Sequence, residues 1–127
     1  MLFYNDLKNK KFIMCGPNVI ESHEHTFKMA SELKKIFSKY DIIFIFKSSF
    51  DKANRSSLNS YRGLGIEEGL KVLKRIKDEL KIPIITDIHE NWQVEKVKDI
   101  VDIIQIPAFL CRQTDLLKAA AETGKII

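Results

Sequence analysis

A loop rich in cations and hydroxyl groups is the feature of this sequence best suited to chemistry. Residues 47–57 hold Lys47, Lys52 and Arg55 together with four serines. Lysine supplies a point charge and arginine a planar fork of donors, while hydroxyl and backbone N–H groups satisfy further phosphate oxygens. The loop therefore predicts a site for an anionic, phosphorylated ligand. A solvated basic loop is the alternative, because no GxxxxGK[ST] motif is present.

Further polar residues follow short apolar runs along the chain. They are Asn18, Asp87, His89, Gln105 and Arg112. In parallel α/β folds, ligands bind at the carboxyl ends of the strands. Polar side chains at strand ends would cost stability inside a core. We therefore expect these residues to face a ligand.

The elements that must position these residues alternate regularly. Short apolar runs rich in Ile and Phe are typical of strands covered on both faces; they span residues 12–15, 42–47, 83–87, 102–106 and 125–127. Apolar residues at spacings of three and four predict helices between them; these stretches span residues 27–40, 70–80, 94–101 and 114–124. Gly124 suits the left-handed residue after a helix end.

This β-α order implies parallel strands joined by right-handed crossovers. Either a small doubly wound sheet or part of a (β/α)8 barrel fits the pattern, and the pattern alone does not choose between them. No linker divides residues 1–127, so we expect one domain. Because the last run reads as a strand just begun, we interpret the chain as truncated.

Composition excludes several classes of protein. The chain has 127 residues, 45% apolar and 30% charged, which is typical of a globular protein. No apolar run approaches the roughly 20 residues that span a membrane, and a dispersed net charge of +4 gives no reason to expect nucleic acid binding. The N-terminus lacks a signal-peptide layout and is expected to lead straight into the first strand, which favours a cytoplasmic location. Cys15 and Cys111 are expected to be buried free thiols.

Four sequence blocks resemble, in order and over nearly the whole chain past residue 12, the 3-deoxy-D-manno-octulosonate 8-phosphate (KDO8P) synthases. The blocks are GPNVIES, FKSSFDKANRSSLNSYRGLGIEEGLKVL, ITDIHE and DIIQIPAFLCRQTDLLKAAAETG. The related 3-deoxy-D-arabino-heptulosonate 7-phosphate synthases typically lack the KANRSS loop. The resemblance implies an α/β fold, a (β/α)8 TIM barrel. This chain would cover about its first half, from the first strand to the start of the fifth.

The resemblance also implies a reaction in lipopolysaccharide biosynthesis. Phosphoenolpyruvate condenses with D-arabinose 5-phosphate to give KDO8P and phosphate. The enol carbon attacks the sugar aldehyde, water adds to the resulting cationic carbon, and phosphate leaves by C–O cleavage. Both substrates are anionic, which agrees with the cationic loop.

Residues that match the family's motifs take implied roles. The implied catalytic residues are Asn18, Lys47, Lys52 and Asp87. The implied substrate-binding residues are Lys47, Lys52, Asn54, Arg55, Ser56, Asp87, Gln105 and Arg112. Arg55 and Ser56 match the grip on the sugar phosphate, and Arg112 matches an arginine that reaches a neighbouring subunit's sugar phosphate. The implied interface segment is Pro107, Ala108 and Phe109.

Asn18 bears on the metal requirement. The family has a metal-dependent class with Cys at this position and a metal-independent class with Asn. A thiolate suits a soft divalent metal and an amide oxygen does not. We therefore expect the metal-independent class, with no metal and no cofactor, and we expect His89 to be a supporting or structural residue.

Several alternatives remain at this stage. The family is a homotetramer, and the rest of its catalytic residues belong to a second half that this sequence lacks. We expect an isolated half barrel to have little stability and no turnover unless it dimerises or pairs with a complementary C-terminal half. The chain is then a fragment of an active synthase, half of a split enzyme, or a remnant that only binds sugar phosphate. A flavodoxin-like phosphate-binding module, with its fifth strand inside the sheet, is the alternative from another class.

Overall fold

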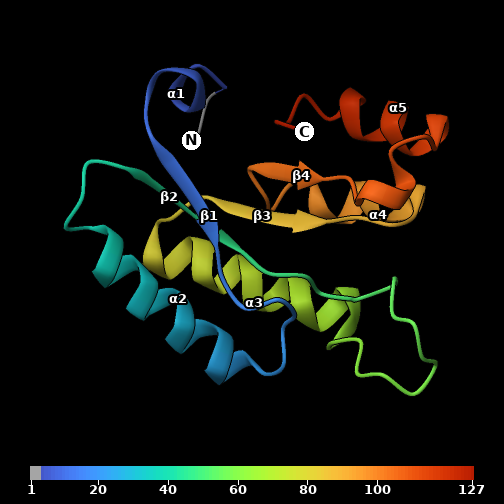
Figure 1. The fold of residues 1–127 in the computed structure, drawn as a ribbon, viewed down its shortest axis with the longest axis horizontal. Coiled ribbons are helices and arrows are strands. Elements are labelled where there is room, and N and C mark those ends of the chain that lie inside the picture. The colour runs from blue at the N-terminus through green and yellow to red at the C-terminus, as the bar shows by residue number, and fades with distance from the viewer. Residues whose placement is uncertain (1–3) are drawn as a thin grey trace.

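The computed structural model describes residues 4–127, which form a parallel sheet with helices between its strands (Figure 1). The strands are β1 (Phe12–Cys15), β2 (Ile43–Lys47), β3 (Ile84–Asp87) and β4 (Ile103–Gln105). The helices are α1 (Tyr4–Asn9), α2 (His23–Phe37), α3 (Gly65–Leu80), α4 (Asn91–Val97) and α5 (Thr114–Glu122), with a 3-10 turn η1 (Ala108–Leu110) after β4.

The strands pair in the order in which they occur along the chain. The sheet order is β1-β2-β3-β4, and each neighbouring pair is parallel. Ile126 pairs with Ile103, so the final apolar run lies at the open edge of β4. A flavodoxin-like sheet places its first strand between the second and the third, whereas β1 here pairs with β2 alone among the described strands. Consecutive pairing is the order of a (β/α)8 barrel, and the doubly wound alternative is therefore wrong.

The two faces of the sheet carry separate apolar clusters. Side chains alternate along a strand, so Phe44 and Phe46 of β2 pack with the helices in the larger cluster. Ile45 lies on the opposite face, where it clusters with Ile85 and Ile103. Figure 1 shows α2 and α3 together on the first face and α1 beyond the other. The smaller cluster corresponds to the interior of the barrel.

Local sequence explains the placement of the two longest helices. The Ser22 side chain accepts a hydrogen bond from His25 N at 3.1 Å, which caps the start of α2. In α3 the buried positions include Leu70, Leu73 and Ile76, which follow the helical repeat. These side chains share the larger cluster with Phe46 of β2 and Ile84 of β3, and the loop before α3 follows the carboxyl end of β2.

The structure corrects the sequence-based expectations at several points. The N-terminus was expected to lead straight into the first strand, but the helix α1 precedes β1. Residues 1–3, which that expectation also covered, lie outside the described residues. The run at 125–127 forms a single bridge at Ile126 and not a full strand. Cys15 is half-buried and free, but Cys111 is free and exposed, so the expectation of two buried thiols is wrong for Cys111. Within residues 4–127 no helix combines the length and apolar character needed to cross a membrane.

Candidate active site

Three of the predicted residues end adjacent strands on the same face of the sheet. Lys47 is the last residue of β2, Asp87 the last of β3 and Gln105 the last of β4. Alternation places them on the face of Ile45, Ile85 and Ile103, which is the barrel interior. Asp87 is directly opposite Gln105 in the register. The structure therefore brings these three residues together at the carboxyl ends of the strands.

A buried carboxylate–imidazole pair lies at the end of β3. The side chains of Asp87 and His89 are only 8% and 10% exposed, and Asp87 Oδ2 lies 3.2 Å from His89 Nε2. Because an ionised carboxylate can only accept, His89 Nε2 donates this hydrogen bond. Asp87 Oδ1 and His89 Nδ1 have no hydrogen-bond partner within the described residues. Buried polar atoms without partners are uncommon, so both are available to a ligand or water.

The surroundings keep Asp87 ionised. Burial acts to raise the pKa of its carboxyl, but hydrogen bonding from His89 and the nearby Ser49 hydroxyl act in the opposite direction. With the added charge of Lys52, the pKa of Asp87 lies below its ordinary value. Among the groups that lower this pKa, the hydrogen bond from His89 has the largest effect.

Lys52 lies within the electrostatic reach of three other predicted residues. Burial lowers the pKa of its ammonium group, and the carboxylate of Asp87 partly opposes this effect. Lys47 and Arg55 lower the pKa further by repulsion, and the pKa of Lys52 falls below its ordinary value. When cations are close enough to repel one another, an anion that binds between them relieves the repulsion, which favours binding. An anion site beside Asp87 therefore stays a prediction that these charges favour.

The loop between β2 and α3 is fastened at its base. Arg62 donates to both carboxylate oxygens of Asp51, from Nε at 2.8 Å and from Nη2 at 2.5 Å. Lys52 N also donates to Arg62 O at 2.7 Å. Tyr61 Oη donates to the carbonyl of Ile20 at 3.3 Å, which ties the loop to the segment after β1. We call residues 52–62 the β2–α3 lobe.

The predicted sugar-phosphate residues are on this lobe. Asn54, Arg55 and Ser56 are all exposed, and Arg55 Nε donates to Tyr61 O at 3.2 Å. Their side chains are therefore accessible to a ligand while the base of the lobe is fixed. Their contact with arabinose 5-phosphate stays a prediction.

Asn18 is exposed in the segment that leads from β1 to α2, next to the end of β2. Val19 pairs with Ser49, and Ile20 N donates to Ser49 O at 2.9 Å. Cys15 packs in the helix-side cluster, and burial raises the pKa of its thiol. The described part of the chain contains no cluster of three or more His, Cys, Asp or Glu residues suited to a metal ion.

The other predicted residues are on the loop after β4. Pro107 precedes η1, which contains Ala108 and Phe109, and Phe109 is 87% exposed. Arg112 is exposed just beyond that turn. A large exposed aromatic ring is compatible with a contact between subunits, and the interface role of these residues stays a prediction.

Gln93 is a site-supporting residue that the sequence analysis missed. Its Oε1 accepts from His89 N at 2.7 Å and from Glu90 N at 3.3 Å, and the Glu90 side chain caps the same turn. Gln93 thus fixes the backbone that presents His89. The usual capping-box signature is Ser or Thr followed three residues later by Glu or Gln. Glu90 takes the place of the hydroxyl residue, so the signal in the sequence was only partial.

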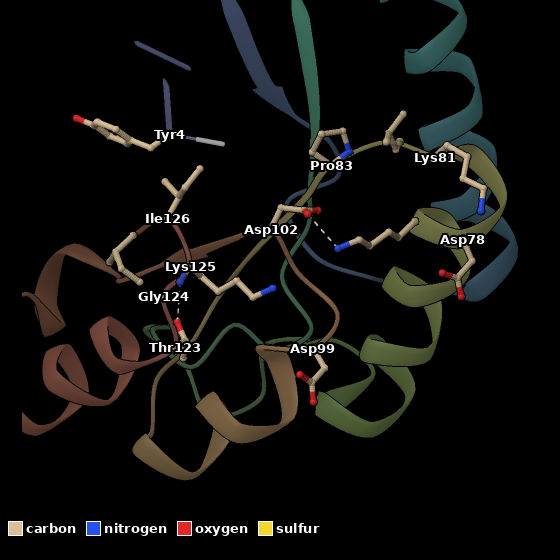
Figure 2. Close-up of a pocket in the computed structure, with 13 residues that line it drawn as sticks. Tyr4, Asp78, Lys81, Pro83, Asp99, Asp102, Thr123, Gly124, Lys125 and Ile126 are labelled. Carbon is tan, nitrogen blue, oxygen red and sulfur yellow. Dashed lines mark hydrogen bonds and ion pairs between the residues drawn. The ribbon is translucent and has the colours of Figure 1, made fainter. Parts of the chain in front are cut away.

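A cavity of about 1050 Å³ lies at the opposite ends of the strands (Figure 2). Its lining includes Pro83 and Asp102, which directly precede β3 and β4. Lys77 Nζ donates to Asp102 Oδ1 at 3.0 Å and neutralises that carboxylate. Since ligands bind at the carboxyl ends of parallel strands, we do not assign a substrate to this cavity.

The fold and the site together define a parallel α/β protein whose predicted cationic residues follow the carboxyl end of β2 and lie near Asp87 at the end of β3. Residues 6–127 match the model of the DAHP synthetase I family, and the chain belongs to that family.

Individual relatives are more specific. The chain is 61% identical over 129 residues to a 2-dehydro-3-deoxyphosphooctonate aldolase of Pisum sativum, which covers 100% of this chain and 44% of the relative. It is 58% identical over 128 residues to the corresponding aldolase 1 of Arabidopsis thaliana, covering 99% and 44%. A Fusobacterium nucleatum aldolase of the same name is 56% identical over 119 residues, covering 93% and 43%.

The name of these relatives is a synonym of KDO8P synthase, so the predicted resemblance is confirmed. The chain spans less than half the length of the curated relatives it matches.

Proposed function

We propose that this chain supplies the first half of a KDO8P synthase, which condenses phosphoenolpyruvate with D-arabinose 5-phosphate and releases phosphate. The single observation that carries the proposal is the clustering of Lys47 and Lys52 beside the ionised Asp87 at the carboxyl ends of β2 and β3. The names of the relatives support the same reaction.

The residues divide the work according to their chemistry. Lys47 and Lys52 bind the anionic groups of phosphoenolpyruvate. They also polarise the sugar aldehyde, because its oxygen gains negative charge in the transition state. Asp87 and Gln105 form the floor of the site. Asn54, Arg55 and Ser56 hold the phosphate of arabinose 5-phosphate. Fixing two anions in attack geometry is the main catalytic task.

The reaction proceeds without a metal ion in this proposal. Asn18 offers an amide oxygen where a metal-dependent enzyme needs a thiolate. Cys15 does not substitute for that thiolate, because it packs among the helices and burial raises its pKa.

The active assembly also contains a complementary second half and forms a homotetramer in the cytoplasm. In that assembly Arg112 reaches the sugar phosphate of a neighbouring subunit, and Pro107, Ala108 and Phe109 form part of the contact.

Phosphate release from phosphoenolpyruvate and arabinose 5-phosphate tests the proposal. The chain is assayed alone and mixed with the remaining part of the Pisum sativum relative, with and without a chelator. We expect chelator-resistant release in the mixture. Arg55→Ala is expected to abolish it. Lys74→Ala, which removes a cation of the exposed Lys74–Asp78 pair on α3, serves as the matched charge control.

The failed outcomes are distinct. Binding of arabinose 5-phosphate without turnover in any mixture would leave a sugar-phosphate-binding protein, the second candidate. Absence of both binding and turnover in a folded mixture would overturn the proposal. Release that a chelator abolishes would overturn only the metal-independent assignment.

A further inference from the structure

Two buried hydroxyl groups connect the ends of three strands. Thr86 Oγ1 donates to Ser48 O at 2.8 Å, and Ser48 Oγ donates to Pro17 O at 2.9 Å. Thr86 and Ser48 are both fully buried. We call Thr86, Ser48 and Pro17 the hydroxyl relay. It runs from the end of β3, across the end of β2, to the segment after β1.

Each member of the hydroxyl relay is the immediate neighbour of a predicted catalytic residue. Pro17 precedes Asn18, Ser48 follows Lys47 and Thr86 precedes Asp87. Asp87 faces the barrel interior, and the side chain of Thr86 points the other way because successive residues of a strand alternate. The hydroxyl relay therefore lies behind the catalytic side chains and touches none of the proposed substrates.

The same region is tightly packed, so a displacement at one strand end reaches the next. A Cβ atom added at Gly16 would lie 2.0 Å from Lys47 O. Beyond Pro17, Val19 pairs with Ser49 and continues the contact between the two segments. Buried hydroxyls that satisfy carbonyl groups in such a region hold one geometry, because an unpaired buried carbonyl is costly.

We infer that Thr86 and Ser48 are positioning residues that set the relative placement of Asn18, Lys47 and Asp87 across three strands. The inference deepens the proposed function and rests on it for its catalytic meaning. The geometric part, coupling between the ends of β3 and β1 through Ser48, is independent of any substrate. The two parts can therefore be tested separately.

Thr86→Val removes the hydroxyl at nearly constant shape, and Thr86→Ser keeps it. Ile76→Val is the control, because Ile76 is fully buried in α3 and loses a methyl group away from the strand ends. The first readout is the set of backbone amide chemical shifts of the full chain. The second is the affinity for phosphoenolpyruvate, measured by titration of the chain mixed with the remaining part of the Pisum sativum relative.

With Thr86→Val we expect amide shifts to change at Asp87, Ser48, Asn18 and Val19, and the affinity to fall about fivefold, the effect of one net hydrogen bond. Thr86→Ser should restore both, and Ile76→Val should change neither.

Shift changes confined to residues next to Thr86 would overturn the coupling. An equal loss of affinity in Ile76→Val would overturn the positioning role. Coupling that reaches Asn18 while the unaltered mixture with the second half fails to bind phosphoenolpyruvate would retain the relay and count against the proposed function.

Discussion

Gly16→Ala should separate the segment after β1 from the end of β2. The added Cβ would lie 2.0 Å from the carbonyl oxygen of Lys47 and 3.0 Å from its carbon, whereas real Cβ atoms essentially never approach below 3.0 Å. The two backbones must therefore move apart by about 1 Å, and neither is a flexible side chain that could give way.

The expected cost follows from the contacts at this point. Forced overpacking costs about 1–3 kcal/mol. The movement also weakens the Ser48–Pro17 hydrogen bond, which contributes about 1 kcal/mol. We expect the free energy of unfolding to fall by about 2–4 kcal/mol, measured by urea unfolding followed by circular dichroism.

Gly124 provides the matched control, because its requirement for glycine has a different cause. Its φ is 67°, and a Cβ there would meet nothing within 4 Å. Gly124→Ala should cost about 1–2 kcal/mol from the left-handed conformation alone, and Gly124→Asn should recover part of it, since Asn tolerates that conformation. Gly16→Asn should be no better than Gly16→Ala. If Gly16→Ala unfolds within about 0.5 kcal/mol of the unaltered chain, or if Asn rescues it, the steric reasoning is refuted.

Three further predictions concern the site. Asp51→Asn removes the charge that holds Arg62, so proteolysis within residues 52–62 should become faster. The free energy of unfolding should change by less than about 1 kcal/mol. An unchanged cleavage rate would contradict the role of this ion pair in fixing the β2–α3 lobe. The pKa of Asp87 in the folded state lies below its unfolded value of 3.8, so its stabilising contribution is present above about pH 4 and lost as the pH falls through the folded pKa. Asp87→Asn should therefore reduce the loss of stability at acid pH, measured by urea unfolding at a series of pH values. An identical slope in the variant would disprove the lowered pKa of Asp87. Lys52 should be acetylated by acetic anhydride near pH 8 faster than the average lysine, because its lowered pKa leaves more free amine; mass spectrometry showing slower labelling would contradict this.

The sequence predicted those parts of the fold that depend on repeated local patterns. The predicted apolar runs match β1 to β4 to within one residue at each end. The stripe through Leu70, Leu73 and Ile76 lies within α3, which begins earlier than predicted. The helix α1 was missed because its six residues carry no apolar repeat. Its Leu7 packs against the smaller cluster, so tertiary contact and not local propensity accounts for it.

The site was predictable in its residue types and not in its connections. Lys47, Asp87 and Gln105 could be located because strand ends are recognisable from pattern. The pairing of Asp51 with Arg62 could not be predicted, because the two residues are eleven positions apart and no periodicity links them. Likewise, strand alternation shows that Thr86 points away from Asp87, but only the three-dimensional structure shows that its hydroxyl reaches Ser48 O.

The consecutive order of the sheet also has a consequence for synthesis. From β2 onward, each strand of the sheet pairs with the strand that precedes it in the sequence. Each of β2, β3 and β4 thus finds a neighbour already present when it emerges from the ribosome. Such short-range pairing lowers the contact order and favours folding during translation, one βα unit after another.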